Sequence, residues 1–460
     1  MQLPDFYTNQ IQGAIHGLDR VRFRGTLRWL ANAQGLQTFL SHAGILLKDF
    51  ADLVQAKTRR IRASGDEAAC ALGIETQYLR SSAVDKEALA RQIAAAKNIR
   101  HGSLAMFSVV ESCVAPGVEG NRATKQLEVR MRPRRCVWGY HYWDDPQVGF
   151  GHVRLQTWVP FTAHICLNGR HWLEKQLQHE AIACRQDGNC FPWLENIPRA
   201  QVLLQRQLRT AWPKLLDRLV AQTCPDLARI LEPLIWQYYW SAEETEYAMD
   251  LMYRRAAEVQ ALYPQLLWEG MRLSDAPSVL RYLGKGQLSA QGKAMETIPA
   301  EIVSKYRRRQ PGVRIKHWVN HNSVKLYNKA GNLLRVETTI NNTRPFKVYR
   351  RPNDDPQQSR RYLPMRKGVS DLQRRCQVSQ RCNERYVAAA GRHGDGGDIA
   401  ANCQRCVSTA AERAATVSGV GAVAESGSAD AGISGEGRTR SERVLQCGPA
   451  SVARRGDRGT

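Results

Sequence analysis

Several familiar binding motifs are absent from this sequence. The chain has 12 cysteines among 460 residues, and only Cys403 and Cys406 show the Cys-x-x-Cys spacing, so the paired sets that form a zinc ribbon are missing. No glycine-rich segment has the spacing of a nucleotide-binding P-loop. No helix-turn-helix, zinc finger or RNA-binding aromatic motif is recognisable either. These absences argue against an NTPase and against a dedicated nucleic-acid-binding module of a common type.

Long apolar runs are also absent. No window holds about 18 consecutive apolar residues, the length that a membrane-spanning helix needs. The first residues, MQLPDFYTNQIQGAIHGLDR, do not place a basic segment before an apolar one, as a secretory signal does. Cysteines without a pairing pattern fit a reducing compartment. We therefore expect a cytoplasmic protein without a membrane-inserted segment.

What the chain does have is positive charge. It carries 66 Lys and Arg against 43 Asp and Glu, a formal net charge of +23, and its sequence pI is about 9.8. Such a field attracts polyanions, of which nucleic acid is the commonest. We therefore expect a nucleic-acid partner, DNA or RNA, and favour DNA. The alternative is a structural or regulatory protein in which an arginine-rich composition makes the charge incidental.

The residues from Arg314 to Arg350 show the clearest local pattern. β-Branched and aromatic residues alternate with polar ones, and Gly and Asn interrupt them where turns are needed, which is typical of a β-meander. Asn328–Asn332 supplies a Gly and two Asn for a tight turn. The predicted strands are Val313–Val319, Ser323–Tyr327, Leu333–Ile340 and Phe346–Arg350.

The alternation assigns side chains to the two faces of this meander, because successive residues of a strand point to opposite sides. One face is apolar and is expected in the core; it carries Val324, Leu326, Leu334, Val336 and Ile340. The other face gathers four polar side chains from neighbouring strands, Lys325, Tyr327, Arg335 and Glu337.

These four side chains suit phosphoryl-transfer chemistry. Glu337 can hold a divalent cation, magnesium or manganese, while Lys325 and Arg335 neutralise phosphate oxygens. Tyr327 can attack as a nucleophile or stack on a base. Glu111 is a second candidate metal ligand, because it interrupts an apolar strand predicted at Leu104–Val114. The ordinary alternative is a solvated sheet face with cross-strand ion pairs and a packed tyrosine.

Basic residues bracket the meander on both sides. A basic surface around a candidate site supports nucleic-acid binding better than a basic average does. The candidate contacts to nucleic acid are Arg307, Arg308, Arg309, Arg314, Lys316, Lys329, Arg344 and Lys347.

The meander also carries a resemblance. NSVKLYNK at 322–329 and LRVETTIN at 334–341 resemble a large bacterial protein family of unassigned activity. That resemblance extends to MRKGVSDL at 365–372, RLQTWVPF at 154–161 and LNGRHW at 167–172, and covers most of residues 1–386.

A shorter stretch, Lys-x-Tyr-x-Lys followed by Arg-x-Glu, is similar to a hairpin of plasmid and phage rolling-circle replication initiators. Those enzymes nick DNA through a tyrosine with a bound divalent metal. The resemblance implies Tyr327 and Glu337 as site residues. The chain departs from the pattern of common relaxases, because it has no His-hydrophobic-His motif and would have to bind the metal through carboxylates.

Three folded regions and a tail are predicted. Residues 1–168 form an α+β region that opens with a short helix, and its strand-rich second half includes Glu111. Residues 169–300 form a helical subdomain with a long helix over Ala242–Gly270, in which Glu243, Glu244, Glu246 and Asp250 complement the helix dipole. Residues 301–386 hold the meander and one more helix. The fold class is therefore α+β, with one mixed, largely antiparallel sheet.

Residues 387–460 differ from the rest of the chain. They contain no Phe, Trp, Tyr or Lys, and Ala, Gly, Ser and Arg dominate without hydrophobic period. Such a segment cannot bury enough apolar surface to become ordered. We expect a disordered tail or an out-of-frame gene end.

Taken together, these features predict a nucleic-acid-processing enzyme of mobile-element character, a metal-dependent endonuclease or strand transferase. The rival hypothesis is a non-catalytic DNA- or RNA-binding protein in which the same lysines and arginines only contact phosphates.

Overall fold

The computed structural model describes residues 10–232, 237–272, 274–284, 301–308, 312–352 and 357–391. The chain divides into two units, Met1–Val417 and Ser418–Thr460, and every described residue belongs to the first. Residues 387–391 still belong to helix α11 (Leu372–Gly391), so the predicted tail began too early; its remainder lies outside the described residues.

Helices accompany one sheet of 11 strands, so the predicted α+β class is confirmed. The strand order is β10-β11-β12-β13-β9-β1-β6-β5-β4-β3-β2, and all neighbours run antiparallel except the parallel pair β2 and β3. Its strands are β1 (Ile11–Thr26), β2 (Thr76–Leu79), β3 (Gly102–Asn121), β4 (Gln126–Asp145), β5 (Gly149–Gln156), β6 (Ala163–Asn168), β9 (Tyr239–Tyr253), β10 (Ile302–Arg308), β11 (Val313–Val319), β12 (Asn322–Lys329) and β13 (Leu333–Ile340).

Two small hairpins stand outside this sheet. One pairs β7 (Cys184–Asp187) with β8 (Cys190–Leu194). The other pairs β14 (Lys347–Arg350) with β15 (Arg361–Pro364), so the last strand predicted for the meander forms but does not join the main sheet.

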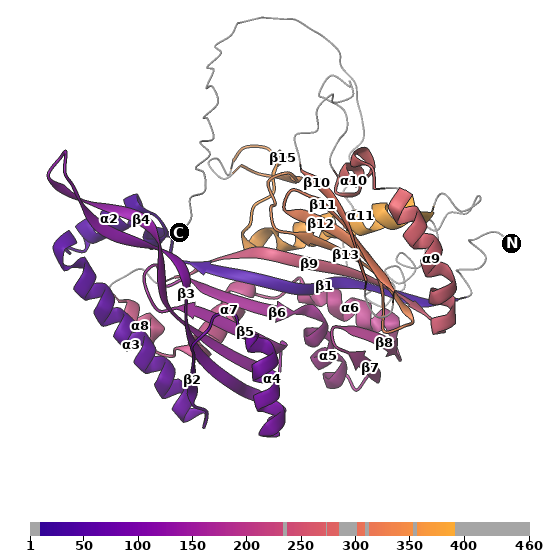
Figure 1. Cartoon of the computed structure of the whole chain (residues 1–460), viewed down its shortest axis with the longest axis horizontal. Coiled ribbons are helices and arrows are strands. Elements are labelled where there is room, and N and C mark those ends of the chain that lie inside the picture. The colour runs from indigo at the N-terminus through magenta and orange to yellow at the C-terminus, as the bar shows by residue number, and fades with distance from the viewer. Residues whose placement is uncertain are drawn as a thin grey trace, which may run out of the picture. The chain divides into compact units, whose positions relative to one another are not determined.

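Helices lie against both ends of the sheet (Figure 1). Three of them, α9, α10 and α11, lie beside the meander, whereas α3 and α4 lie near β2 and β3. Asp85 caps α4, because its side chain accepts a hydrogen bond of 3.0 Å from the Ala88 amide. The remaining bounds are α2 (Ala33–His42), α3 (Phe50–Ala71), α4 (Lys86–Ala96), α5 (Gly169–His179), α6 (Ile197–Gln207), α7 (Trp212–Thr223), α8 (Leu227–Leu231), α9 (Ala256–Arg272) and α10 (Ala276–Tyr282), with short 3₁₀ turns at Arg28–Ala31, Leu47–Asp49 and Val369–Asp371.

The long helix predicted over Ala242–Gly270 is wrong. Its first half is strand β9, which hydrogen-bonds to β13 on one side and β1 on the other, and only its second half is helix α9. In β9, apolar Tyr247, Met249 and Leu251 alternate with Glu246 and Asp250, which is the period of a strand. Pairing on both edges outweighs the weak helix preference of the acids.

Strand β1 is extended from Ile11 onward, so the predicted opening helix does not occur in the described part of the chain. A bulge follows in this strand: from Leu18 to Val21 it advances three residues while β9 advances only two, from Tyr247 to Thr245. Bulges re-aim side chains next to a ladder. Asp19 and Arg20 occupy this bulge, Asp19 buried and Arg20 exposed.

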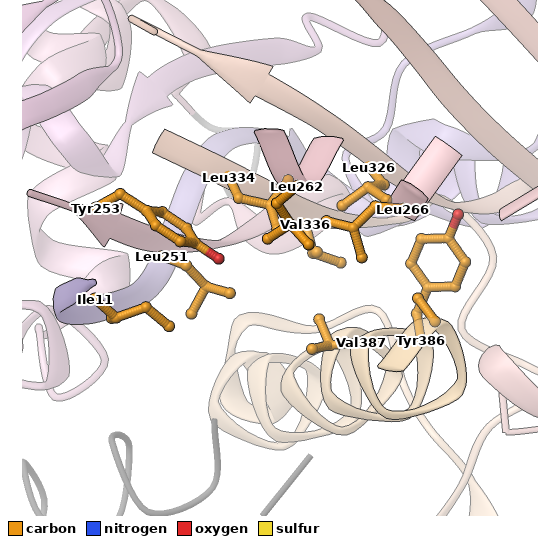
Figure 2. A pocket seen from close by; sticks show the side chains of 11 residues that line it. Ile11, Leu251, Tyr253, Leu262, Leu266, Leu326, Leu334, Val336, Tyr386 and Val387 are labelled. Carbon is orange, nitrogen blue, oxygen red and sulfur yellow. The ribbon is translucent and has the colours of Figure 1, made fainter. Parts of the chain in front are cut away.

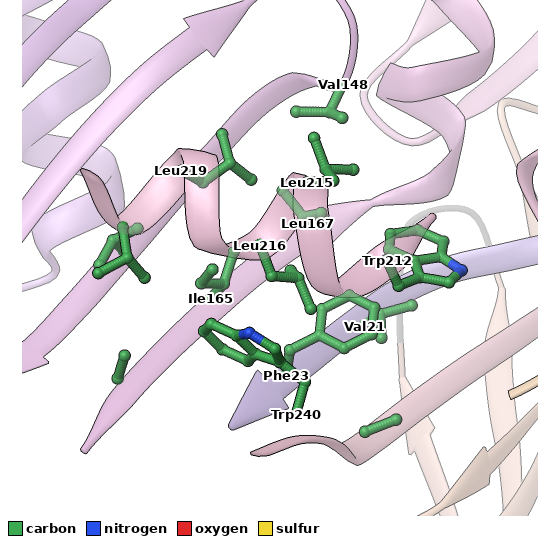
Figure 3. Close-up of a cluster of buried hydrophobic side chains, with 14 of the residues drawn as sticks. Val21, Phe23, Val148, Ile165, Leu167, Trp212, Leu215, Leu216, Leu219 and Trp240 are labelled. Carbon is green, nitrogen blue, oxygen red and sulfur yellow. The ribbon is translucent and has the colours of Figure 1, made fainter. Parts of the chain in front are cut away.

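The largest core lies where α7 covers strands β1, β5 and β6. Leu215, Leu216 and Leu219 of the helix belong to one buried cluster with Phe23 and Ile165 of the sheet (Figure 3). These side chains are all buried, and burying apolar surface of this kind is the main force that closes the sheet and helix together.

A second core confirms the predicted apolar face of the meander. Leu326 and Val336 meet Leu266 of α9 and Tyr386 of α11 (Figure 2). The packing leaves a cavity of only about 20 Å³ between these elements. Helices α9 and α11 therefore cover the face of the meander that was predicted to lie in the core.

His317 of β11 is buried in the same region and bonds on both ring nitrogens, to Ser304 Oγ at 2.7 Å and to Tyr386 Oη at 3.0 Å. Burial lowers its pKa from 6.5 to about 4, so the native imidazole stays neutral where the unfolded one takes a proton.

The free energy of unfolding should therefore fall as the pH drops from 6.5 to about 4, because the unfolded state binds more protons in that window. Glutamine cannot take up this proton. His317→Gln should therefore reduce the slope of the free energy of unfolding against pH by up to about 1.4 kcal/mol per pH unit, the contribution of one proton. Urea unfolding at several pH values measures it, and an unchanged slope in the variant would contradict the assignment.

Candidate functional site

The predicted polar patch forms at the β12–β13 hairpin. Lys325 lies opposite Glu337 and Tyr327 lies opposite Arg335 in the strand register, so the four side chains share one face as expected. That face is not a solvated one, because Arg335 and Glu337 are 0% and 1% exposed. Asn189, between strands β7 and β8, contacts both Arg335 and Lys329 and so covers part of the patch.

Arg335 is the centre of a buried ion network. Its Nη1 donates to Asp19 Oδ2 at 3.0 Å, and its Nη2 donates to Asp250 Oδ2 at 2.8 Å. Arg170 reaches the same Asp250 oxygen at 3.0 Å, so two arginines face two aspartates. The expectation that Arg335 neutralises a substrate phosphate is wrong, because its guanidinium is fully buried and bound to protein carboxylates.

Two asparagines orient Asp19 within this network. Asn168 donates to Asp19 Oδ1 at 3.0 Å, and Asn189 donates to Oδ1 at 2.8 Å and to Oδ2 at 2.6 Å. With Arg335 these donors fix the carboxylate plane of a residue that lies in a bulge. The buried charge is thereby compensated, as a buried ion requires.

Charges in the patch shift the pKa values of its carboxylates. Burial acts to raise the pKa of Asp250, but Arg335 and Arg170 outweigh it and hold that pKa below its usual value. Lys325 and Arg335 do the same for Glu337. The pKa of Glu246 is instead raised, by burial and then by the neighbouring Glu337.

Tyr327 is not prepared as a nucleophile. Its hydroxyl donates to Glu337 Oε2 at 2.9 Å, and burial together with Glu337 raises its pKa well above the usual 10. A phenol held in the neutral form and hydrogen-bonded to a carboxylate positions that carboxylate.

Three carboxylates converge at one end of the patch. Ligand oxygens of Asp19, Glu246 and Glu337 all lie within 4.8 Å of one another, and their strands β1, β9 and β13 are consecutive in the sheet. We name this group the acidic triad. Oxygen ligands of this type suit a hard divalent cation.

The acidic triad opens toward solvent on the side of Glu246, whose side chain is 15% exposed. There the Lys325 ammonium lies 3.3 Å from Glu246 Oε1 and also pairs with Glu337. Lys325 thus takes the place of a cation beside two of the three carboxylates.

Glu111 does not belong to this site. It lies on β3, and five strands stand between β3 and β13, so about six spacings of 4.8 Å, roughly 29 Å, separate it from Glu337. Tyr140, Arg154 and Lys86 satisfy its carboxylate at 2.8, 2.6 and 3.1 Å. One ion held by both Glu111 and Glu337 is therefore excluded, and that prediction is wrong.

Several predicted nucleic-acid contacts form one cationic surface at the sheet edge. Across β10 and β11, Arg307 lies opposite Arg314 and Lys305 opposite Lys316, and across β11 and β12 Lys316 lies opposite Lys325. We name Lys305, Arg307, Arg314 and Lys316 the cationic platform. Paired residues share a face, so the platform continues directly into the polar patch.

Like charges directly opposite each other destabilise a sheet. Strands β10 and β11 contain no Asp or Glu to offset them. Burial, and then Lys325 and Arg314, lower the pKa of Lys316. The ammonium groups of Lys316 and Lys305 lie 4.2 and 5.6 Å from the ring centroid of Trp318. An anion bound from solution would therefore offset the repulsion on this surface.

The other candidate contacts lie elsewhere. Arg308 is exposed but belongs to the alternate residues of β10 and points away from the platform. Lys329 donates to Asn189 in the buried network, and burial and Arg335 lower its pKa. Arg344 and Lys347 are exposed beyond β13, and Arg309 lies outside the described residues.

Sequence analysis missed four residues of the site: Asp19, Arg170, Glu246 and Asp250. Glu246 and Asp250 were assigned to a helix start, although the alternation within β9 was a signal for a strand. Asp19 lies on β1, at a position where the sequence analysis predicted no strand, and Arg170 is brought to the site by α5 with no local pattern to mark it.

Comparisons with known proteins do not assign this site. No family model, curated protein or solved structure matches the chain. Within the part of the chain that the structure describes, no helix is long and apolar enough to cross a membrane. The functional argument therefore depends on the geometry of the acidic triad and the cationic platform.

Replacing Arg335 by Met should lower the free energy of unfolding by about 3–5 kcal/mol, because Asp19 and Asp250 would lose their buried partner. The matched control is Arg199→Met, which breaks a bidentate pair with the more exposed Glu180 and should cost at most about 1 kcal/mol. Urea unfolding measures the free energy of unfolding of both variants. Equal losses would show that the buried network contributes no more to stability than an exposed ion pair.

Proposed function

We propose that this protein binds nucleic acid on the cationic platform and cleaves or joins phosphodiester bonds at the acidic triad, with magnesium or manganese as the metal. The observation that carries the proposal is the direct adjacency of the two features. Lys305, Lys316, Lys325 and Glu337 form a continuous row across β10, β11, β12 and β13. Three strand spacings, about 14 Å, separate the first and last of these residues.

The platform's part is to hold the phosphate backbone. Its two cross-strand rows, Arg307 with Arg314 and Lys305 with Lys316, lie two residues apart along the strands, about 7 Å. Phosphates bound to these rows would bring a neighbouring phosphodiester toward Lys325 at the edge of the acidic triad. Contacts of this type are independent of sequence.

The triad's part is to hold the cation by Asp19, Glu246 and Glu337. A bound divalent ion supplies polarisation of a phosphoryl oxygen and a more acidic bound water. Asn168 and Asn189 keep Asp19 oriented, and Tyr327 keeps Glu337 oriented. Lys325 sits where it can exchange its carboxylate contacts for a substrate phosphate.

We assign Tyr327 a positioning role, so water rather than tyrosine would attack the phosphorus. This differs from the replication-initiator resemblance, which requires a protein-linked product. Mobile-element character and DNA as the substrate remain proposals that depend on that resemblance and on the basic charge.

One observation favours a second candidate, a non-catalytic nucleic-acid-binding protein. Lys325 already neutralises two of the triad's carboxylates. If it stays there, the triad is a structural ion network and the platform alone binds phosphates.

Glu337→Gln should abolish manganese binding and metal-dependent cleavage while leaving DNA affinity within about threefold, because the triad loses one anionic ligand but the platform is intact. Titration followed by electron paramagnetic resonance measures Mn²⁺ binding, and denaturing gels of labelled single-stranded and duplex DNA measure cleavage.

The matched control for this variant is Glu243→Gln, on the same strand as Glu246 but paired with Arg22, Arg24 and His164. It should keep both activities. Cleavage that survives Glu337→Gln would refute the metal role, and a wild-type protein that binds DNA but neither cuts it nor binds Mn²⁺ would establish the non-catalytic alternative.

Binding should weaken steeply with salt. The double variant Lys305→Gln, Lys316→Gln should reduce the magnitude of the slope of log K against log salt by about 1.4–1.8, since each phosphate contact contributes about 0.7–0.9. Lys48→Gln with Lys97→Gln, both exposed on other elements, serves as the charge-matched control. An identical slope in both double variants would place the nucleic acid away from the platform.

A further inference from the structure

A second polar site lies in a cleft of about 600 Å³ that is separate from the acidic triad. Helices α4 and α5 line it together with the start of β3, the β4–β5 turn region and the β7–β8 hairpin. None of its lining residues belongs to the triad or to the cationic platform. The volume lies in the range of small-molecule sites, about 300–1,000 Å³.

Three titratable side chains meet at the wall of this cleft. Asp144 Oδ2 accepts from Lys175 Nζ at 2.7 Å and lies 2.6 Å from His101 Nδ1. The Lys175 side chain is only 7% exposed, whereas that of His101 is 71% exposed. A rigid lysine and carboxylate therefore hold a histidine that solvent or a ligand can reach.

Donors at this wall are left over for a ligand. With Nδ1 of His101 directed at Asp144, the other ring nitrogen, Nε2, has no partner among the described residues. Lys175 Nζ lies 3.5 Å from Nδ1, at the long limit of a hydrogen bond, so an ammonium with three N–H groups has one strong acceptor. A buried donor without an acceptor is costly, and a bound anion would supply one.

One basic side chain of the cleft is left for an anion. Arg91, Arg100 and Lys175 outnumber Asp144 and Glu174, and His171 and His101 add two imidazoles. Arg91 is already engaged, by Glu87 and by the ring of Phe150 at 3.7 Å. Arg100 is exposed and has no ion-pair partner among the described residues. It is therefore available to a phosphate, for which a guanidinium is well suited.

Another part of the lining can hold an uncharged ring. Ala94, Ile99 and Leu104 form an apolar wall. Gln178 and Gln186 already donate through Nε2 to Glu174 and to the Gly188 carbonyl, and they add amide oxygens and their remaining N–H groups. Apolar walls with a few convergent polar groups are the usual make-up of a small-ligand site.

We propose that this cleft binds a phosphate monoester of nucleotide size. Arg100, His101 and Lys175 hold the phosphate, and the apolar wall with the two glutamine amides holds the ring. The site is independent of the proposed phosphodiester chemistry and involves no covalent step.

The cleft and the acidic triad approach the same hairpin tip. Gln186 and Gly188 line the cleft, and the next residue, Asn189, bonds to Asp19. A test must therefore separate binding in the cleft from binding at the triad or the platform.

The experiment uses the full chain and adenosine monophosphate as the probe, with isothermal titration calorimetry and phosphorus NMR. Arg100→Gln and His101→Asn should each weaken binding at least tenfold, because each removes one phosphate ligand. Both residues are exposed, so neither variant should disturb folding. Lys97→Gln, exposed beside the cleft but not part of it, should bind as the wild type does.

Three outcomes would overturn the proposal. The first is no binding of adenosine monophosphate by the wild type. The second is unchanged affinity in Arg100→Gln and His101→Asn. The third is a loss of affinity in Lys305→Gln, Lys316→Gln instead, which would assign the phosphate to the platform. Inorganic phosphate that binds as tightly as the nucleotide would exclude a role for the apolar wall.

Discussion

The buried contact of Arg335 with Asp19 and Asp250 is the interaction on which the rest of this structure depends. It joins β13, β1 and β9, whose residues are far apart in the sequence, and Asn189 ties the β7–β8 hairpin to the same group. Arg170 pairs with Asp250 as well, so four charges are removed from water, which is costly unless all of them are paired. The buried charges are fully paired only when all of these elements are in place. This requirement fixes the register of the central strands and the position of the hairpin that covers them.

That constraint also fixes the orientation of the neighbouring carboxylates. Asp19 is oriented by Asn168, Asn189 and Arg335, and Glu337 by Tyr327 and Lys325. Neither carboxylate is therefore free to turn away from Glu246. Burial, and then the negative charge of the neighbouring Glu337, raise the pKa of Glu246. On the other side of Lys325, three strands place positive charges opposite positive charges. A sheet face that concentrates cations beside anions in this way favours a ligand that carries phosphate and a metal together.

The sequence predicted much of this arrangement where short-range rules apply. Strands β11, β12 and β13, the sharing of one face by Lys325, Tyr327, Arg335 and Glu337, and the apolar character of the opposite face all follow from period two and a short turn. The prediction of a helix over Ala242–Gly270 was wrong because short-range rules did not decide between helix and strand there. Acidic residues at the start of a segment suit a helix dipole as well as a polar strand face, and only the partners on both edges of β9 decided between them.

By itself, the amino-acid sequence determined the α+β class, the local pairing of the meander, the basic field and the presence of a polar patch, because each depends on neighbours in the chain. Only the tertiary structure decided that Arg335 is a buried partner of Asp19 and Asp250, that Glu246 rather than Glu111 joins Glu337, and that His101, Asp144 and Lys175 line one cleft. These contacts span from 31 to 316 positions of the sequence. Alternation within a strand determines which face of the sheet a side chain lies on. The order of the strands in the sheet determines which other side chains it contacts.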